Sequence, residues 1–152
     1  MLHRAIKIEY KKNASFELTF RTGEVKLLNM EKMFDTYPQL EALKDRKLFT
    51  SGKLSPGGYG VIWNEDLDIE AETIYEEGKL VRTVQVPPNL DVADSVLAAR
   101  ADAGLSQKEL SERTGIDQAD ISKIERGIAN PSVLTLKRLA AGLNRELIIN
   151  FK

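Results

Sequence analysis

The hydrophobic pattern of the chain changes its period once, at a segment that contains two adjacent prolines. In the first half, apolar residues mainly alternate with polar ones, which is typical of half-buried strands. From Asp91 to Asn144 they recur every three or four residues, which is typical of amphipathic helices. The two prolines favour a stiff, extended connection between these patterns. We therefore predict a first domain at 1–83, a linker at 84–90 and a second domain at 91–152.

The first domain is predicted to have an α+β fold, with an antiparallel meander and short helices. Three runs of alternating apolar residues are separated by turn-like segments at 13–15 and 22–23. The apolar positions that would share one face are Ile6, Ile8, Tyr10, Phe16, Leu18, Phe20, Val25 and Leu27. Residues 31–47 then have a helical pattern that Pro38 interrupts, so we expect short helices there. Further strands are expected from Leu48 and through Val61 and Trp63.

In the second domain, two short helical patterns meet at a glycine. Ser106 stands where the first of them begins, and Glu109, three residues later, completes a capping box. Gly115 lets the backbone turn sharply between the two helices. Asp117 is placed to cap the second helix, and Gly127 is placed to end it. The sequence therefore predicts a tight helix pair with well-defined ends.

Two further helices flank this pair, so the domain is predicted to be an all-α bundle. Residues 91–104 form its first helix, and residues 130–132 begin its last one. The apolar residues expected in its core are Val92, Val96, Leu97, Ala99, Leu105, Leu110, Ile116, Ile121, Ile124, Leu134, Leu136, Leu139 and Leu143. The chain closes with residues 146–151, whose composition predicts a C-terminal strand.

The second helix of the pair carries a polar face opposite Ile121 and Ile124. The side chains on that face are Gln118, Ala119, Ser122, Lys123 and Arg126. Glutamine can read adenine with two hydrogen bonds, and lysine or arginine can read guanine or hold a phosphate. The geometry is that of a helix-turn-helix whose second helix suits the major groove of DNA.

These residues resemble the Cro and phage-repressor helix-turn-helix family, often called Xre-type. The matching motifs are Gly-Leu-Ser-Gln at 104–107, Thr-Gly-Ile at 114–116, Ile-Ser-Lys-Ile-Glu-Arg-Gly at 121–127 and Asn-Pro-Ser at 130–132. The resemblance covers residues 91–143. The strand expected after it is similar to that of HigA- and HipB-type antitoxins, in which a C-terminal strand can pair across a dimer.

The resemblance implies roles for particular residues. Gln107 would hold a phosphate and support the second helix of the pair. The residues that would face base edges are Gln118, Ala119 and Lys123. Those that would lie near the DNA backbone are Ser122, Arg126 and Asn130. An internal ion pair between Arg100 and Glu125 would join the first helix of the domain to the third.

Two carboxylates, Asp117 and Asp120, depart from a simple DNA-binding pattern because they lie near the start of the recognition helix. Carboxylates near phosphates lower affinity, although aspartate can accept a hydrogen bond from cytosine. We expect Asp117 to act as the cap. Asp120, a further candidate DNA-binding residue, is either a specificity element or a sign of weak binding. With 22 basic and 23 acidic residues, the chain is expected to have low non-specific affinity and to need a dimer.

These features predict a sequence-specific DNA-binding transcriptional regulator rather than an enzyme. The expected partner is double-stranded DNA with a palindromic operator, bound by a homodimer. The expected action is repression of antitoxin type, with a toxin protein as a candidate second partner. The alternative is a protein-interaction antitoxin that neutralises a toxin without needing DNA binding.

The first domain resembles the small bacterial α+β domains grouped as domain of unknown function 2442. The matching segments are 6–10, 16–24, 28–30, 47–49, 59–69 and 74–77. Members of that family occur beside or fused to helix-turn-helix segments, which implies a regulatory or toxin–antitoxin setting. The family carries no chemistry to transfer, so this domain is expected to bind a partner or a ligand.

Residues 65–77 include seven acidic residues and no basic one. If they continue a strand, one carboxylate face would consist of Asp66, Asp68, Glu70 and Glu72. That face is a solvated surface, a docking surface for a basic partner, or a site for a divalent metal or an acid pair. The spacing lacks the glycine and the closing glutamate of a calcium loop, so no metal site is assigned.

Several classes of function are poorly supported by composition. The chain has no cysteine, which removes thiolate chemistry and disulfides and fits a cytoplasmic protein. Its one histidine, His3, is expected to be solvated, and no cofactor is implied. No run of about 18 apolar residues is present, so no membrane span is expected. Tyr59 and Trp63 either line a small pocket or belong to the core.

Overall fold

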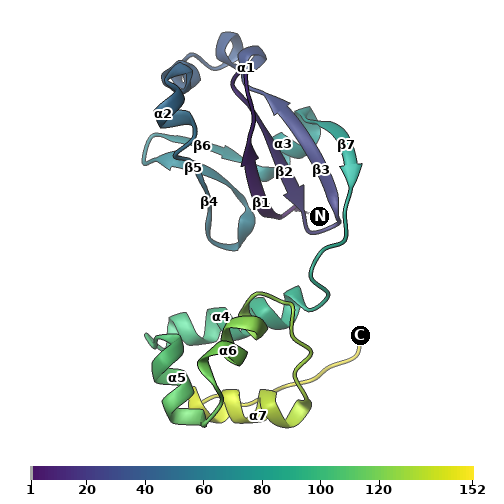
Figure 1. The fold of residues 1–152 in the computed structure, drawn as a ribbon, viewed down its shortest axis with the longest axis vertical. Helices are drawn as coiled ribbons and strands as arrows, with labels where there is room; N and C mark the ends of the chain where they lie inside the picture. The colour runs from purple at the N-terminus through teal and green to yellow at the C-terminus, as the bar shows by residue number, and fades with distance from the viewer. Residues whose placement is uncertain (1) are drawn as a thin grey trace. The chain divides into compact units, whose positions relative to one another are not determined.

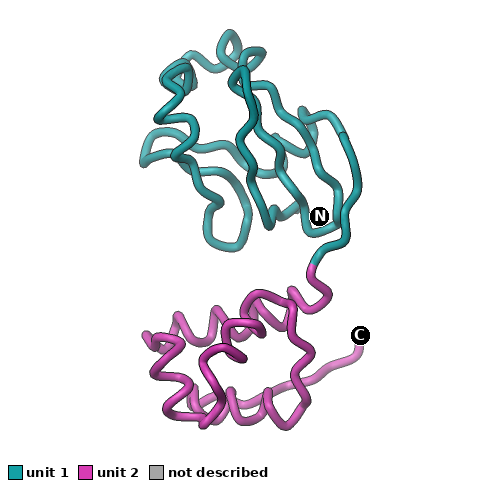
Figure 2. Tube along the Cα trace, in the orientation of Figure 1, with its two compact units in different colours: residues 1–86 teal, residues 87–152 magenta. Residues whose placement is uncertain are grey.

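The chain forms two compact units in the computed structural model, which describes residues 2–152. The first unit ends at Val86 and the second spans Pro87–Lys152 (Figure 2). Each unit has its own cluster of buried apolar residues. None of the helices in the described part of the chain is both long enough and apolar enough to cross a membrane.

The first unit contains two antiparallel sheets and several short helices (Figure 1). Its elements are β1 (Ala5–Tyr10), β2 (Ser15–Phe20), β3 (Glu24–Asn29), α1 (Glu31–Thr36), the 3-10 helix η1 (Pro38–Lys44), α2 (Arg46–Phe49), β4 (Lys53–Leu54), η2 (Pro56–Gly58), β5 (Gly60–Asn64), β6 (Leu67–Glu70), α3 (Ala71–Glu77) and β7 (Lys79–Thr83). One sheet has the order β1-β2-β3-β7 and the other β4-β5-β6. The predicted α+β class and the three-strand meander are therefore confirmed.

The meander buries only part of the apolar face that the alternation predicts, because the expected place of Val25 and Leu27 on that face is wrong. In the β2–β3 register Phe16 lies opposite Leu28 and Glu17 opposite Leu27, so Leu28 joins the core and Leu27 lies on the other face of the sheet. In the β1–β2 register Ile8 lies opposite Leu18, and in β2–β3 Leu18 lies opposite Lys26. Phe16, Leu18 and Phe20 of β2 are fully buried. The ring of Trp63 belongs to the same core, and its Nε1 donates to the carbonyl oxygen of Phe49 at 2.7 Å. Of the two interpretations of Trp63, the structure supports a core position.

Two strand predictions are wrong, because a helix begins within each predicted strand. Leu48 lies in α2, because the side chain of Asp45 accepts a hydrogen bond from the backbone of Lys47 at 3.0 Å and starts a helical turn. The strand expected across the acidic segment ends at Glu70, and α3 starts at Ala71. Ala71 and Ile74 are buried three residues apart, which is a helical spacing. The carboxylates of this segment therefore do not form one continuous strand face.

The expectation that His3 is solvated is also wrong. Its ring stacks on Tyr75 of α3, with the ring centroids 3.4 Å apart. Its Nδ1 lies 2.8 Å from Oε1 of Glu72, and its backbone N–H donates to the same carboxylate at 2.9 Å. Those hydrogen bonds lower the pKa of Glu72. Glu72 thus fixes the start of the chain against α3.

The second unit is the predicted helical bundle, made of α4 (Leu90–Asp102), α5 (Gln107–Thr114), α6 (Gln118–Glu125) and α7 (Val133–Gly142). Its buried core consists of Val96, Leu110, Ile116, Ile121, Ile124, Leu139 and Leu143. Two residues expected in this core, Leu97 and Leu134, are exposed instead, at 44% and 69%. The buried positions of their helices are instead Ala93 and Val96 on α4 and Leu139 on α7.

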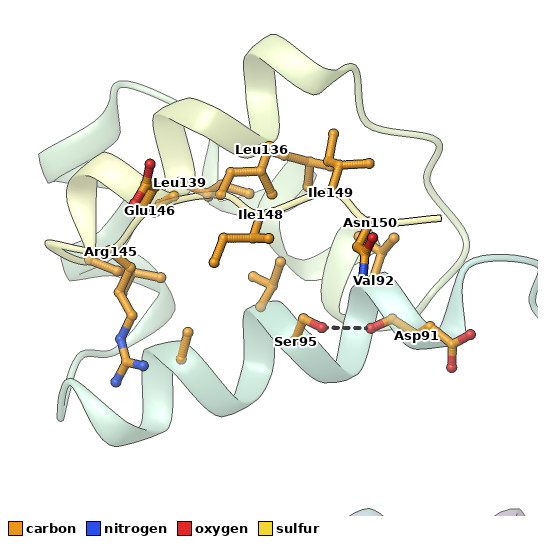
Figure 3. Close-up of a pocket in the computed structure, with 15 residues that line it drawn as sticks. Asp91, Val92, Ser95, Leu136, Leu139, Arg145, Glu146, Ile148, Ile149 and Asn150 are labelled. Carbon is orange, nitrogen blue, oxygen red and sulfur yellow. Dashed lines mark hydrogen bonds between the residues drawn. The ribbon is translucent and has the colours of Figure 1, made fainter. Parts of the chain in front are cut away.

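The C-terminal strand expected at 146–151 is not formed within this chain. Residues 145–152 have no regular secondary structure. A strand needs a partner strand for its backbone hydrogen bonds, and the described part of the second unit contains only helices and loops. The segment instead runs beside α4 and α7, where it lines a groove (Figure 3).

Substitution of two neighbouring glycines in η2, Gly57 and Gly58, tests how closely β1 packs against this 3-10 helix. A Cβ on Gly58 would lie 2.0 Å from the carbonyl oxygen of Ala5, whereas one on Gly57 would meet the exposed ring of Tyr59 at 2.8 Å. Both have positive φ, so each alanine variant carries the same backbone strain. We expect Gly58→Ala to destabilise the first unit by about 3 kcal/mol or more, and Gly57→Ala by about 1–2 kcal/mol.

The measurement is urea unfolding followed by fluorescence of Trp63, the one tryptophan of the chain, which reports on the first unit. Equal losses of unfolding free energy in the two variants would contradict the close approach of η2 to β1.

Candidate nucleic-acid interface

The helix pair α5–α6 has the ends that its sequence predicts. The hydroxyl of Ser106 accepts from the backbone N–H of Glu109 at 3.1 Å, and the Glu109 carboxylate accepts from the backbone N–H of Ser106 at 2.7 Å. This reciprocal pair is a capping box, and it lowers the pKa of Glu109. Gly115 ends α5 with φ at 71°, in the left-handed region. The turn into α6 is therefore tight and locally defined.

A charged network joins α6 to the two helices before it. Arg100 of α4 donates to both carboxylate oxygens of Glu125, from Nε at 2.6 Å and from Nη2 at 2.9 Å. Its Nη1 also donates to the carbonyl oxygen of Leu105 at 2.8 Å. Gln107 of α5 donates to the same Glu125 carboxylate at 2.8 Å. The ion pair implied by the family resemblance is present, and it holds α4, α5 and α6 together.

Burial makes this network matter for stability. Only 3% of the Glu125 side chain and 18% of the Arg100 side chain are exposed. The hydrogen bonds that Arg100 donates to Glu125 raise the pKa of Arg100. Neither side chain can turn to solvent without leaving its partner charge behind, which is costly at such a site.

With α6 fixed in this way, its other face is left free. Ile121 and Ile124 are buried on the inner side. The sequence-predicted residues that are exposed are Gln118, Ala119, Asp120, Lys123, Arg126 and Asn130, while Ser122 is half-buried. Arg126 donates from Nε to the Ser122 carbonyl oxygen at 3.3 Å. The other exposed side chains of this set form no hydrogen bond or ion pair with any residue in the described range 2–152. The exposed amides and cations are thus available to a partner.

Gln107 differs from the other candidates because its amide already has a partner inside the unit. Its Nε2 donates to Glu125, so the supporting role implied for it is visible. The phosphate contact implied for it stays a prediction, and it would have to use the remaining donor or the carbonyl oxygen of the same amide.

The expectation that Asp117 caps α6 with its side chain is wrong. Its carboxylate makes no cap hydrogen bond. The backbone carbonyl of Asp117 instead accepts from the N–H groups of Asp120 and Ile121, at 3.0 and 3.1 Å. Those bonds are enough to begin the helix, so the carboxylate stays in solvent.

A groove of about 400 Å³ lies between the starts of α6 and α7. It is lined by Asp117, Asp120, Asn130, Ser132, Thr135 and Arg138, among others. Sequence reasoning did not single out Thr135 or Arg138. The sequence contains little indication of them, because they lie after the Ser132 cap at positions that are also polar in amphipathic helices with no binding role.

The acidic segment of the first unit is less organised. Asp68 and Glu70 are exposed on β6 and, together with His3, Tyr59 and Glu72, line a shallow pocket of about 380 Å³. Among residues 2–152, no three histidine, cysteine, aspartate or glutamate side chains form a group that could hold a metal ion.

The tight glycine turn, the anchored α6 and its free polar face define the second unit as a helix-turn-helix. Comparisons with known proteins lead to the same class. A family model described as helix-turn-helix matches residues 96–149, and another, described as a protein of unknown function (DUF2442), matches residues 5–79.

Similar proteins are named as regulators. An HTH-type transcriptional regulator of Haemophilus influenzae is 34% identical over 99 residues, which are 64% of this chain and 90% of that protein. Another, of Methanothermobacter thermautotrophicus, is 41% identical over 49 residues, or 32% of this chain and 71% of that protein. The chain therefore belongs to the HTH-type transcriptional regulators, with a DUF2442 region before its helix-turn-helix.

Among solved structures, the restriction-modification controller protein C.AhdI from Aeromonas hydrophila is 30% identical. The match covers 38% of this chain and 86% of that one, with a TM-score of 0.37.

Removal of the charge on Glu125 tests the network. Glu125→Gln would leave Arg100 largely buried beside a neutral amide, so we expect the second unit to lose about 2–4 kcal/mol of unfolding free energy. Glu112→Gln, at an exposed position of α5, removes the same charge and should change stability by less than about 0.5 kcal/mol. Helical circular dichroism during urea unfolding measures both. Equal stability of the two variants would show that the network does not hold α6.

Proposed function

We propose that the chain is a sequence-specific transcriptional repressor that binds a palindromic DNA operator as a homodimer. The observation that supports it most is the exposed polar face of α6, which carries Gln118, Lys123 and Arg126 on a helix fixed from behind by Glu125. A helix held in this way can enter the major groove without having to order itself first. The half-sites are then about one helical turn of DNA, or 34–36 Å, apart or at a multiple of that spacing.

The predicted contacts divide into two kinds. Gln118, Ala119 and Lys123 would lie against base edges and supply sequence preference. Gln107, Ser122, Arg126 and Asn130 would lie near phosphates and set the position of the protein on the duplex. Asp120 is not assigned to either kind of contact, because its carboxylate is repelled by phosphate and needs a hydrogen-bond donor on the DNA.

The C-terminal segment supports the dimer. A groove of about 650 Å³ lies between this segment, α4 and α7 (Figure 3). Two apolar side chains near it face solvent, Ile148 at 79% exposure and Phe151 at 93%. Together with Ile149, which is 58% exposed, they form an exposed apolar segment, which a second copy of the chain that brings the same segment would cover. The strand expected at 146–151 would then find its partner across the dimer.

The antitoxin type is part of the same proposal. The DUF2442 unit would bind the second partner, a toxin protein or a ligand, and would alter repression through different affinities for the free and bound states. The alternative, an antitoxin that acts by protein interaction alone, uses the first unit and makes no use of the α6 face.

Binding to the DNA upstream of the chain's own gene tests the repressor proposal. We expect Gln118→Ala and Lys123→Ala each to weaken that binding by about 5- to 150-fold, with a smaller effect on random DNA. Fluorescence anisotropy titrations at two salt concentrations measure both. Lys32→Ala, which removes an exposed positive charge from α1, should leave binding unchanged. Equal, weak binding of the unaltered protein to both DNAs would refute the proposal for that operator, and toxin neutralisation by both α6 variants would favour the alternative.

The dimer makes a separate prediction. We expect Ile148→Asp combined with Phe151→Asp to raise the dimer dissociation constant by about 100-fold, because two apolar side chains would no longer be buried. Asn150→Asp adds one charge to the same segment without removing an apolar side chain and should keep the dimer. Light scattering after size-exclusion chromatography gives the mass of each variant. A dimer that persists in the double variant would place the interface elsewhere.

A further inference from the structure

Asn89 immediately precedes α4, but its side chain does not cap that helix. It stands at the N-cap position, where an asparagine side chain usually accepts a hydrogen bond from the first turn, and no such bond is formed. Its Nδ2 instead donates to the carbonyl oxygen of Ala129 at 2.6 Å, across 40 positions of the chain. Its backbone N–H donates to the carbonyl oxygen of Gly127 at 3.1 Å. Asn89 therefore holds the loop that follows the recognition helix α6 at two points.

That loop is packed closely against the residues at the start of α4. A Cβ on Gly127 would lie 3.0 Å from Cδ2 of Leu90 and 3.3 Å from the carbonyl carbon of Asn89. Gly127 also has φ at 75°, in the left-handed region. Glycine meets both requirements without strain, so the backbone of the loop can approach Asn89 closely enough for the two hydrogen bonds.

The bond to Ala129 determines where the next backbone N–H points. No peptide bond among residues 2–152 is cis, so the carbonyl of Ala129 and the N–H of Asn130 point in opposite directions. Because the carbonyl is held toward Asn89, that N–H points away from Asn89. It has no hydrogen-bond partner within the described range, and the Asn130 side chain is exposed. Both groups can therefore donate to a phosphate of DNA, which accepts from backbone and side-chain donors alike.

We infer that Asn89 is a positioning residue for DNA binding, which orients the loop at 127–130 so that Asn130 donates to a phosphate. The inference rests on the proposed DNA-binding function, and it adds to that site a residue of the predicted linker at 84–90. Asn89 acts through the loop and does not touch the DNA. A loop that is held in place before binding loses less conformational entropy when the DNA arrives, so the phosphate contact is stronger.

Fluorescence anisotropy with upstream DNA and with random DNA tests the inference on the whole chain through Asn89→Ser. Serine keeps a neutral helix cap but is too short to reach Ala129. We expect binding to both DNAs to weaken alike, by about 2- to 10-fold, because a phosphate contact carries no sequence information. The salt dependence should stay the same, since a neutral amide neutralises no phosphate. Asn29→Ala is the matched control, because it removes an asparagine that bonds to backbone in the first unit, and it should not change binding.

A double-variant cycle separates positioning from an independent effect of Asn89. If Asn89 acts through Asn130, the combination of Asn89→Ser with Asn130→Ala should weaken binding by less than the product of the two separate fold-changes. Circular dichroism of each variant checks that the helices are intact.

The possible failures are distinguishable. Binding of Asn89→Ser that equals that of the unaltered protein would overturn the inference, and so would a double variant that reaches the full product. Both results leave the proposed function standing as long as the unaltered protein prefers the upstream DNA. If the unaltered protein shows no such preference, the proposed function fails for that operator and the inference fails with it.

Discussion

The bidentate ion pair between Arg100 and Glu125 determines what the rest of the second unit can do. The recognition helix α6 has eight residues, and a helix of that length is not stable in water by itself. Its apolar contacts, Ile121 and Ile124, attach one side to the core, and the Glu125 carboxylate fixes its far end to α4 and α5. Because the helix is held at both places, its remaining side chains can stay polar and exposed without loss of structure.

Local signals predicted most of this unit from the sequence. The capping box at Ser106 and the turn at Gly115 involve only residues that are close in the sequence, so both can be predicted without knowledge of the fold. The prediction for the start of α6 is wrong. Aspartate is a common N-cap residue, but here only the backbone carbonyl of Asp117 accepts hydrogen bonds from the helix. In the first unit, the side chain of Asp45 caps a short helix, α2, and Leu48 therefore lies in that helix and not in a strand.

Features that depend on distant residues could not be predicted. His3 meets Glu72 across 69 positions of the chain, and no spacing rule connects them. The terminal strand was expected from its own composition, but a strand exists only when another backbone supplies its hydrogen bonds. The groove that contains Asp120 and Arg138 arises from the way α6 and α7 meet, and neither helix shows it separately. The candidate DNA-binding residues were found more easily because they share one short helix.

The balance of charge limits how such a site can work. A protein that neutralises many phosphates gains affinity for every sequence alike, but this chain has a net charge of −1 and carries carboxylates at the start of its recognition helix. In the proposed dimer, affinity for DNA would come from base contacts and from two half-sites engaged together, since each half alone would bind weakly. Loss of that proposed dimer would therefore reduce occupancy of the proposed operator far more than loss of any single phosphate contact. A partner of the first unit that altered dimerisation would control DNA binding without touching α6.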